Sequence, residues 1–231
     1  MSTQFHLVNR GFTDALLLIP GWAADYRIFN SLDLDFNYLL PAPLSLHDFE
    51  DALTGSLRKA ELSRISILGW SLGGFLAASF ASNYPEYVKD VTFIGMRGGY
   101  DTTGLEKVKR LIRNNKTAYL YKFYNEWFSS GEEEKRSRIL FKNTLAGDFL
   151  KESDTRELLD GLDYLGRARL DSAGLKDVKL KFIHGGDDRI APIEEITDLK
   201  KGFPGAEFVI VKGAGHAPFL RRDFRKIFYG K

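Results

Sequence analysis

The stretch that most constrains the fold is "ISILGWSLGGFLAASFASNYP", residues 65–85. A short apolar run, typical of a buried strand, passes within four residues into an apolar helix that ends before Pro85. Gly69 and Gly73 flank Ser71 between the two elements, and glycine permits the close backbone approach that a tight turn needs. A strand followed at once by such a helix is typical of a parallel sheet covered by helices on both faces.

The same alternation recurs along the chain and predicts an α/β fold. Apolar runs predict buried strands at residues 16–19, 38–40, 65–68, 91–94, 180–183 and 208–211. Helix-like segments fall between them, at residues 47–60, 72–84 and 194–201.

Residues 100–170 do not show this alternation, because their pattern predicts successive helices with no strand between them. A parallel sheet does not continue easily through so much helix. We therefore expect residues 1–99 to form the first part of an α/β core, residues 100–170 a helical lid, and residues 171–231 the second part of the core.

Composition excludes several function classes. Lys plus Arg number 33 against 31 Asp plus Glu, a formal charge of +2 that gives no indication of a nucleic-acid partner. The absence of cysteine excludes disulfides, thiolate zinc sites and a cysteine nucleophile. The first residues do not resemble a signal peptide, and no apolar run is long enough to cross a membrane. We expect a soluble, cytoplasmic protein without a membrane partner.

The pattern Gly69-x-Ser71-x-Gly73 has two interpretations. One is a glycine-rich turn that cradles a phosphate, but the stretch has neither the lysine of a phosphate loop nor the G-x-G-x-x-G spacing. The other is the nucleophile elbow of α/β-hydrolases, a sharp strand-to-helix turn that exposes the serine Oγ at the helix N-terminus. The context favours Ser71 as a nucleophile.

Serine is a poor nucleophile at neutral pH, so it needs a base and a group that orients the base. In α/β-hydrolases the chain order is serine, acid, histidine. Only His216 follows every plausible acid near a strand end. We expect structural roles for His6 in a terminal strand, His47 near a helix start and His184 at a strand end.

The acid is expected in "LKFIHGGDDRIAP", after the strand that precedes His216. Asp187 and Asp188 are adjacent there. Adjacent loop residues point in different directions, so only one of the two carboxylates can orient the imidazole. The residues alone leave the choice open.

The run "LLLIPGWAADY", residues 16–26, stops abruptly at Pro20-Gly21-Trp22. An ordinary turn would explain this stop. A loop whose backbone N–H faces a ligand would also explain it, and an oxyanion hole needs such a donor together with the N–H that follows the nucleophile. We therefore expect Leu72 and Trp22 to supply the two donors.

With these residues assigned, the chain resembles the α/β-hydrolases along its whole length. Within them it is similar to the BioH type, the pimeloyl-[acyl-carrier protein] methyl ester esterases of biotin synthesis. The resemblance rests on "GWSLGG", on "GW" at 21–22, on "GAGHAPF", and on a G-x-x-D-x-φ-x-P pattern (φ apolar) matched by Gly185, Asp188, Ile190 and Pro192. This pattern selects Asp188 as the acid. The chain departs from the family at Pro20, where His is usual, and in lacking a Gly-x-Gly-x-Ser stretch; both departures bear on the shape of the acyl pocket.

The resemblance implies a serine carboxylesterase that hydrolyses the methyl ester of pimeloyl-[acyl-carrier protein], with a Ser71-Asp188-His216 triad and no metal or cofactor. Two alternatives stay open: a general short-acyl carboxylesterase, and a non-catalytic interaction protein on this fold.

The resemblance also implies roles for the helical insertion. Its basic residues would dock an acidic carrier protein, although a solvated helix face explains them equally well. Two aromatic residues would line an acyl channel, although aromatic residues at helical spacing are more often plain core. The docking residues would be Lys109, Arg110, Arg113 and Lys116, and the channel residues Phe123 and Trp127.

Overall fold

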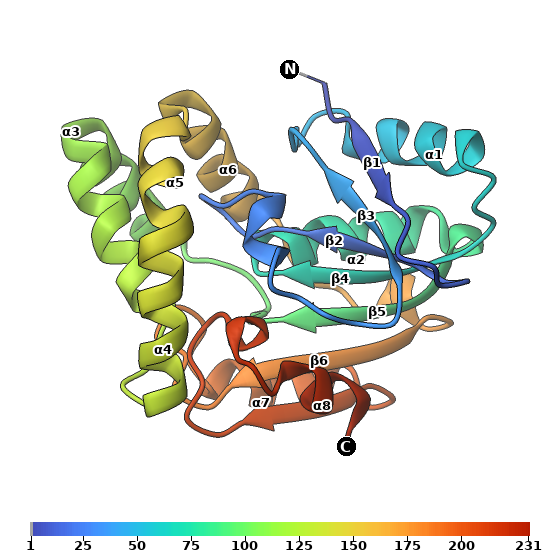
Figure 1. Cartoon of the computed structure of the whole chain (residues 1–231). Coiled ribbons are helices and arrows are strands. Elements are labelled where there is room, and N and C mark those ends of the chain that lie inside the picture. Colours follow the sequence, from blue (N-terminus) through green and yellow to red (C-terminus); the bar gives the residue numbers. More distant parts are fainter. Residues whose placement is uncertain (1) are drawn as a thin grey trace.

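The computed structural model describes residues 2–231, in which seven strands form one sheet of order β1-β3-β2-β4-β5-β6-β7 (Figure 1). All neighbouring pairs are parallel except the edge pair β1–β3. The strands are β1 (Phe5–Val8), β2 (Ala15–Ile19), β3 (Asn37–Pro41), β4 (Ile65–Trp70), β5 (Val88–Ile94), β6 (Lys179–Gly185) and β7 (Glu207–Val211). The predicted α/β class is confirmed, and all six predicted strands are present.

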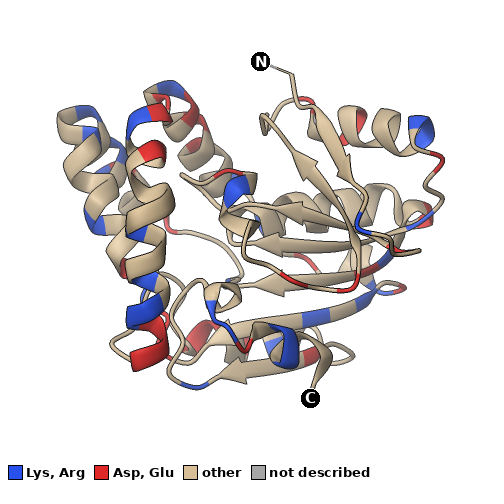
Figure 2. Ribbon diagram, in the orientation of Figure 1, with Lys and Arg blue, Asp and Glu red and all other residues tan. Residues whose placement is uncertain are grey.

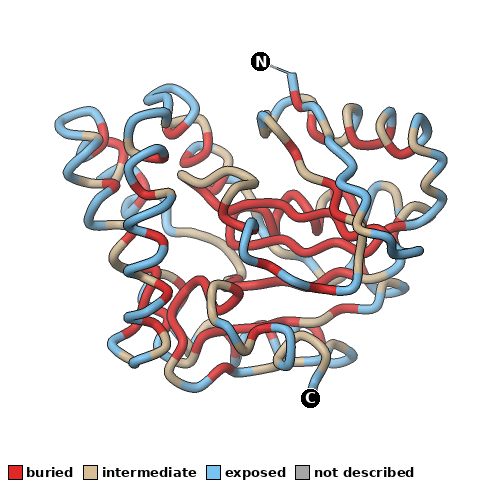
Figure 3. The backbone as a smooth tube through the Cα atoms, viewed as in Figure 1, coloured by how far each residue is buried: buried red, intermediate tan, exposed pale blue. Residues whose placement is uncertain are grey.

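The centre of the sheet forms because its strands are apolar on both faces. Every residue of β2 and of β4 is buried, and charged residues lie mainly on the helices and loops outside the central strands (Figures 2 and 3). Trp70, Phe80, Phe93 and Phe182 are among the largest side chains that are fully buried. Three of the four residues of β1 are exposed, as suits an antiparallel edge strand.

Helices surround this sheet. The helix after the Ser71 turn, α2, packs against β2, β4 and β5, so it is apolar nearly all round. The helices that accompany the strands are α1 (Phe49–Lys59), α2 (Leu72–Asn83), α7 (Glu194–Gly202) and α8 (Phe224–Tyr229). Of these, α8 was not expected from the sequence.

Between β5 and β6 the chain forms four helices that stand together at one end of the sheet (Figure 1). They are α3 (Thr102–Glu126), α4 (Glu132–Phe141), α5 (Gly147–Glu152) and α6 (Thr155–Arg167), with a π-turn, Lys142–Ala146, joining α4 to α5. α3 packs on α5 and α6 and is kinked at Asn115. We call these helices the α3–α6 segment.

The parallel strands point their carboxyl ends toward the α3–α6 segment (Figure 1). Ligands in open α/β sheets bind outside these ends. Every predicted catalytic residue lies in a turn or loop that follows one of these strands. In residues 2–231, no helix is long and apolar enough to cross a membrane.

Candidate active site

Ser71 lies at the turn between β4 and α2 in a backbone conformation that most residues avoid, with φ 54° and ψ −116°. The glycines beside it are required by space. A Cβ on Gly69 would come 2.6 Å from the Gly73 carbonyl oxygen, and a Cβ on Gly73 would come 2.4 Å from that of Ile19. β4 and α2 can approach this closely only because Gly69 and Gly73 carry no side chain. The turn between them places Ser71 at the N-terminus of α2.

Asp188 and His216 lie in contact, although 28 residues separate them. The Nδ1 of His216 is 2.7 Å from Asp188 Oδ2. The other carboxylate oxygen, Oδ1, accepts hydrogen bonds from the backbone N–H groups of Ile190 and Ala191 at 2.8 and 2.9 Å. Burial opposes ionisation of Asp188, but the adjacent His216 and these donors outweigh it and lower the pKa of the carboxyl. Asp188 is therefore a buried carboxylate bonded to the His216 imidazole.

Asp187 has a different environment. Its side chain is exposed, whereas that of Asp188 is buried. The backbone N–H of Asp187 donates to the Ala214 carbonyl, at 2.9 Å. In the part of the chain that the structure describes, the Asp187 carboxylate makes no hydrogen bond. The geometry therefore distinguishes Asp188 from Asp187, a choice that the residues alone left open.

The ring of His216 is fixed on several sides. Its backbone N–H donates to the Trp127 carbonyl at 2.8 Å, and its carbonyl accepts from Trp70 Nε1 at 2.9 Å. Gly95, with φ 59°, leaves room for the ring, since a Cβ there would lie 2.9 Å from two ring atoms. The remaining ring nitrogen, Nε2, is buried and has no hydrogen-bond partner among residues 2–231.

Ser71 and His216 both lie next to the end of β5. The backbone N–H of Ser71 donates to the Ile94 carbonyl at 2.9 Å, and the next residue, Gly95, lies against the imidazole. Tyr100, which follows the same strand, lies near the Ser71 side chain. The Ser71 turn and the His216 loop therefore adjoin at this point of the sheet.

Two backbone donors lie beside Ser71. Gly21 approaches closely enough that a Cβ there would be 3.3 Å from the Ser71 Cβ. Trp22 follows Gly21, and Leu72 is the first residue of α2, where N–H groups have no partner within the helix. Within residues 2–231 neither the Trp22 N–H nor the Leu72 N–H makes a hydrogen bond. Both are free to bind a ligand oxygen.

The Trp22 side chain anchors this loop to the α3–α6 segment. Its Nε1 donates to the Leu158 carbonyl at 2.8 Å, and its ring packs edge-on against Phe123 with centroids 5.0 Å apart. Gly161 makes room for the indole, because a Cβ there would lie 2.7 Å from it. The free N–H of Trp22 is thereby held in a fixed place.

A cavity of about 430 Å³ adjoins these donors. Its walls come from the Trp22 loop, the loop after β3 and helices α5 and α6. They include Gly21, Trp22, Leu44, Leu46, Leu72, Phe149, Leu158 and Gly161. Arg27 also lines the cavity, but its guanidinium is bound by Asp25 and Glu152, the main reason its pKa is raised. Asp25, Glu152, Asp154 and Glu157 line the cavity as well, so its walls are mainly apolar but include four carboxylates, and its size suits a small acyl chain.

The four predicted docking residues of α3 differ in how far their charged side chains are exposed and paired. Lys109 is buried and pairs with Glu106 and Asp163, so the expectation of a free cation there is wrong. Lys116 is half-buried and donates to the Ser153 carbonyl. Arg110 and Arg113 are exposed. Two of the four predicted residues thus present unobstructed charge.

The predicted channel residues also differ. Phe123 is half-buried against Trp22. Trp127 is wholly buried, with its ring 4.8 Å from that of Trp70, so it belongs to the core, and its predicted place in a channel is wrong. Among the described residues, those that line the 430 Å³ cavity include neither of them.

Sequence reasoning missed two polar side chains near the site, Tyr100 and Glu134, and gave His184 only a structural role at a strand end. Tyr100 lies near Ser71; burial raises the pKa of its phenol, and the Arg97 guanidinium stacks over its ring at 4.8 Å. His184 is buried beside the acid, with Nε2 2.8 Å from the Ala191 carbonyl. Glu134 is a buried carboxylate of α4. Only for His184, three residues before Asp187, did the sequence offer a positional signal.

Gly185, at the end of β6, provides a test of how tightly the acid and histidine loops pack. A Cβ there would lie 2.0 Å from the Gly215 carbonyl oxygen and 2.5 Å from that of Ala214. We expect Gly185→Ala to lower the free energy of unfolding by about 2 kcal/mol or more, as overpacking a rigid site does. Urea titration measures this. The matched control is Gly202→Ala at the end of α7, where nothing lies within 4 Å, and equal losses in both variants would contradict the close packing.

With this geometry established, the comparisons define the class. Residues 35–223 match the family model for the alpha/beta hydrolase fold, so the chain belongs to that family. Solved structures agree in fold. A bromoperoxidase from Bacillus anthracis superposes with TM-score 0.81 at 18% identity, covering 98% of this chain and 94% of that one. The enol-lactonase from Burkholderia xenovorans LB400 superposes with TM-score 0.80 at 16% identity, covering 99% and 95%.

Curated relatives narrow the class and confirm the resemblance predicted from the sequence. The pimeloyl-[acyl-carrier protein] methyl ester esterase of Nitrosomonas europaea is 27% identical over 94% of this chain and 94% of its own length. That of Wigglesworthia glossinidia brevipalpis is 28% identical over 68% of this chain and 65% of its own length. Family and relatives together support a carboxylic ester hydrolase.

Proposed function

We propose that the chain is a serine carboxylesterase in which Ser71 is the nucleophile, His216 the general base and Asp188 the group that orients the base. One observation carries the proposal. A buried His216 is bonded through Nδ1 to Asp188, and its free Nε2 lies at the sheet edge that carries the strained Ser71. Nucleophile, base and orienting acid in this arrangement suffice to activate a serine hydroxyl.

In the first half-reaction an ester binds with its carbonyl oxygen at the N–H groups of Trp22 and Leu72. The Ser71 hydroxyl gives its proton to Nε2 of His216, and Oγ attacks the carbonyl carbon. The two N–H groups stabilise the oxyanion, and Asp188 stabilises the imidazolium. As the tetrahedral intermediate collapses, the ester C–O bond breaks and Nε2 protonates the departing alkoxide.

In the second half-reaction a water molecule takes the place of the alcohol. His216 removes its proton, the hydroxyl attacks the acyl carbon, and the same donors hold the second oxyanion. Collapse breaks the bond to Ser71 Oγ, which recovers its proton from Nε2 and releases the carboxylic acid. The α3–α6 segment is the proposed lid, since its helices α5 and α6 wall the cavity beside the oxyanion donors.

The proposed substrate is the methyl ester of pimeloyl-[acyl-carrier protein], which places the reaction in biotin synthesis. The support is that several curated relatives bear this name, some matching over 94% of the chain. The small methyl leaves as methanol, and the acyl chain extends through the apolar cavity toward the carrier. Arg110 and Arg113 on α3 are the residues proposed to attract an acidic carrier.

A second candidate is a general short-acyl carboxylesterase, and one observation favours it. Lys109 is neutralised by two carboxylates and Lys116 is bonded to a carbonyl, so the basic patch is weaker than the sequence suggested. The Arg27 guanidinium at the cavity is also engaged by carboxylates. A free ester that needs no docking surface fits these facts.

Salt and charge reversal distinguish the two candidates. If Arg110 and Arg113 attract an acidic carrier, the attraction acts between solvated surfaces and is screened over about 8 Å at physiological salt. We expect added salt to raise KM for the carrier-bound methyl ester about tenfold while changing kinetics on 4-nitrophenyl butyrate less than twofold. The double variant Arg110→Glu/Arg113→Glu should reproduce this rise at low salt.

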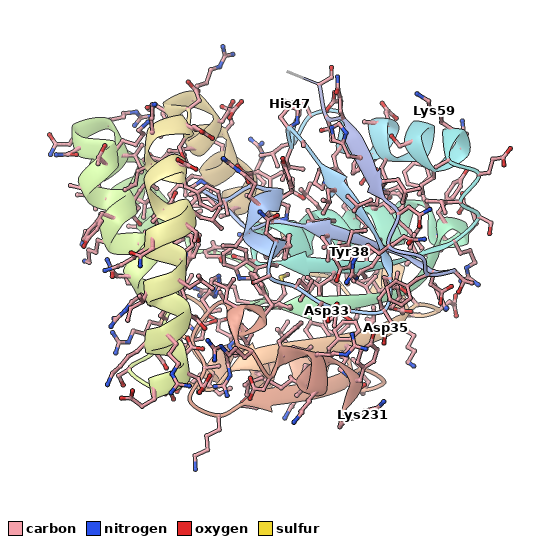
Figure 4. All side chains as sticks on the ribbon, viewed as in Figure 1. Asp33, Asp35, Tyr38, His47, Lys59 and Lys231 are labelled. Atoms are coloured by element: carbon pink, nitrogen blue, oxygen red, sulfur yellow. The ribbon has the colours of Figure 1, made fainter. Side chains whose placement is uncertain are left out.

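The control variant changes the same amount of charge elsewhere. Lys59 at the end of α1 and Lys231 at the C-terminus are exposed and far from α3 (Figure 4). Lys59→Glu/Lys231→Glu should leave both KM values within twofold. If carrier-bound and free esters respond alike to salt and to both double variants, the patch is only a solvated face and the second candidate is preferred.

A further inference from the structure

Glu134 is the third residue of α4, and it is only 1% exposed. In the acidic run that contains it, Glu132 is exposed and Glu133 is half-buried. One carboxylate oxygen, Oε2, accepts hydrogen bonds from the backbone N–H of Gly215 at 3.2 Å and of Ser129 at 3.3 Å. Among the described residues, the other oxygen has no partner. A buried carboxylate of the α3–α6 segment thus binds the residue that precedes His216.

This contact is part of a seam of hydrogen bonds between the two segments. The His216 N–H donates to the Trp127 carbonyl at 2.8 Å, and Ser129 Oγ donates to the Gly213 carbonyl at 2.6 Å. Further along, Ser137 Oγ donates to the Leu220 carbonyl at 2.9 Å. The loop that carries the proposed base is therefore fixed to the α3–α6 segment on one side as well as to the sheet.

The geometry at Gly215 leaves little freedom. A Cβ there would lie 2.4 Å from the Trp127 carbonyl oxygen and 2.9 Å from the Ser129 nitrogen. A buried N–H without an acceptor is strongly disfavoured. Glu134 supplies that acceptor.

Stability alone does not account for a carboxylate here. Burial raises the pKa of Glu134 against the effect of its two donors, and the charged groups that face it, Arg221 and Asp187, act in opposite directions. An apolar side chain would avoid this desolvation but would leave the Gly215 N–H unpaired. A buried carboxylate at position 134 is explained if the loop that carries His216 needs a hydrogen-bond acceptor there.

We propose that Glu134 is a positioning residue: by accepting the Gly215 N–H it holds the loop so that His216 keeps its Nδ1 on Asp188 and its Nε2 toward Ser71. The proposal rests on the proposed function for the role of His216. It makes the α3–α6 segment a support of the catalytic base in addition to a wall of the substrate cavity.

Two replacements of similar size test this. Glu134→Met fills the space but accepts no hydrogen bond, whereas Glu134→Gln can place its carbonyl oxygen where Oε2 lies and accept both N–H groups. For 4-nitrophenyl butyrate we expect Glu134→Met to lower kcat at least tenfold with KM within twofold. Glu134→Gln should restore kcat to within threefold of the unmodified enzyme.

The matched control is Ser137→Ala, which removes a hydrogen bond of the same seam farther from His216 and should leave kcat within twofold. Circular dichroism checks that each variant is folded. The proposal is overturned if Glu134→Met keeps kcat within twofold, if Glu134→Gln loses as much as Glu134→Met, or if Ser137→Ala loses as much as either.

A readout without turnover separates this proposal from the proposed function. Amide hydrogen exchange at Gly215 and His216 should accelerate at least tenfold in Glu134→Met and remain unchanged in Glu134→Gln. If the unmodified protein hydrolyses no ester, the esterase proposal fails while exchange still reports the loop. Unchanged exchange in Glu134→Met overturns the role of Glu134 whatever the activity.

Discussion

Replacing Ser71 with alanine is expected to lower kcat/KM for 4-nitrophenyl butyrate by about 10⁴-fold or more, because nothing else at the site can form the acyl-enzyme. The fold should persist, since the change removes a single hydroxyl group and leaves the backbone hydrogen bond from Ser71 to the Ile94 carbonyl in place. Steady-state kinetics on both proteins, with circular dichroism to confirm folding, measure this.

The control for this prediction is Ser82→Ala, a change of the same kind at an exposed position of the same helix, α2. It should leave kcat/KM within twofold. Residual turnover above about 1% in Ser71→Ala would show that another group attacks the ester, and the mechanism proposed above would be abandoned.

The second large effect is expected at the acid. Asp188→Asn should reduce kcat about 10⁴-fold, because an amide NH₂ facing His216 Nδ1 favours the wrong imidazole tautomer and cannot balance the imidazolium charge. Asp187→Asn should change kcat less than twofold, since its carboxylate is exposed and does not contact His216. The two variants differ by one position and make the same chemical change, so each is the control for the other.

Kinetics at fixed pH, read with the denaturation midpoint of each variant, decide this prediction. A strong loss in Asp187→Asn with little change in Asp188→Asn would mean that the acid is misassigned. Equal strong losses would indicate that the whole loop, and not one carboxylate, supports the histidine.

The sheet could be predicted from the sequence because its central strands are apolar at every position, as in "ISIL" and "LLLI". The edge strand β1 and the helix α8 are harder, for physical reasons. β1 is mostly exposed and is stabilised by pairing with β3, and α8 has six residues, too few for a periodic pattern. Tertiary contacts, not local sequence, define both.

The site shows the same division. Ser71, Asp188 and His216 are recognisable because each follows a strand and a tight turn requires glycine at fixed spacing. The residues that surround them cannot be recognised from the sequence. In "GEEEKRSR" nothing distinguishes the buried Glu134 from the exposed Glu132 and the half-buried Glu133 before it, and nothing marks Lys109 as paired with Asp163, 54 residues away. Burial and ion pairing arise from how helices pack, which the local pattern does not encode.

The positive φ at Ser71 has a consequence for how this enzyme can change over time. A side chain held in such a conformation costs about 1–3 kcal/mol, a sizeable part of the roughly 5–15 kcal/mol that keeps a domain folded. Glycine would occupy the turn without this strain. Selection for thermal stability alone would therefore favour replacing the proposed nucleophile with glycine. An inactive descendant of this chain would then be more stable than its parent. Only demand for its product keeps the serine in place.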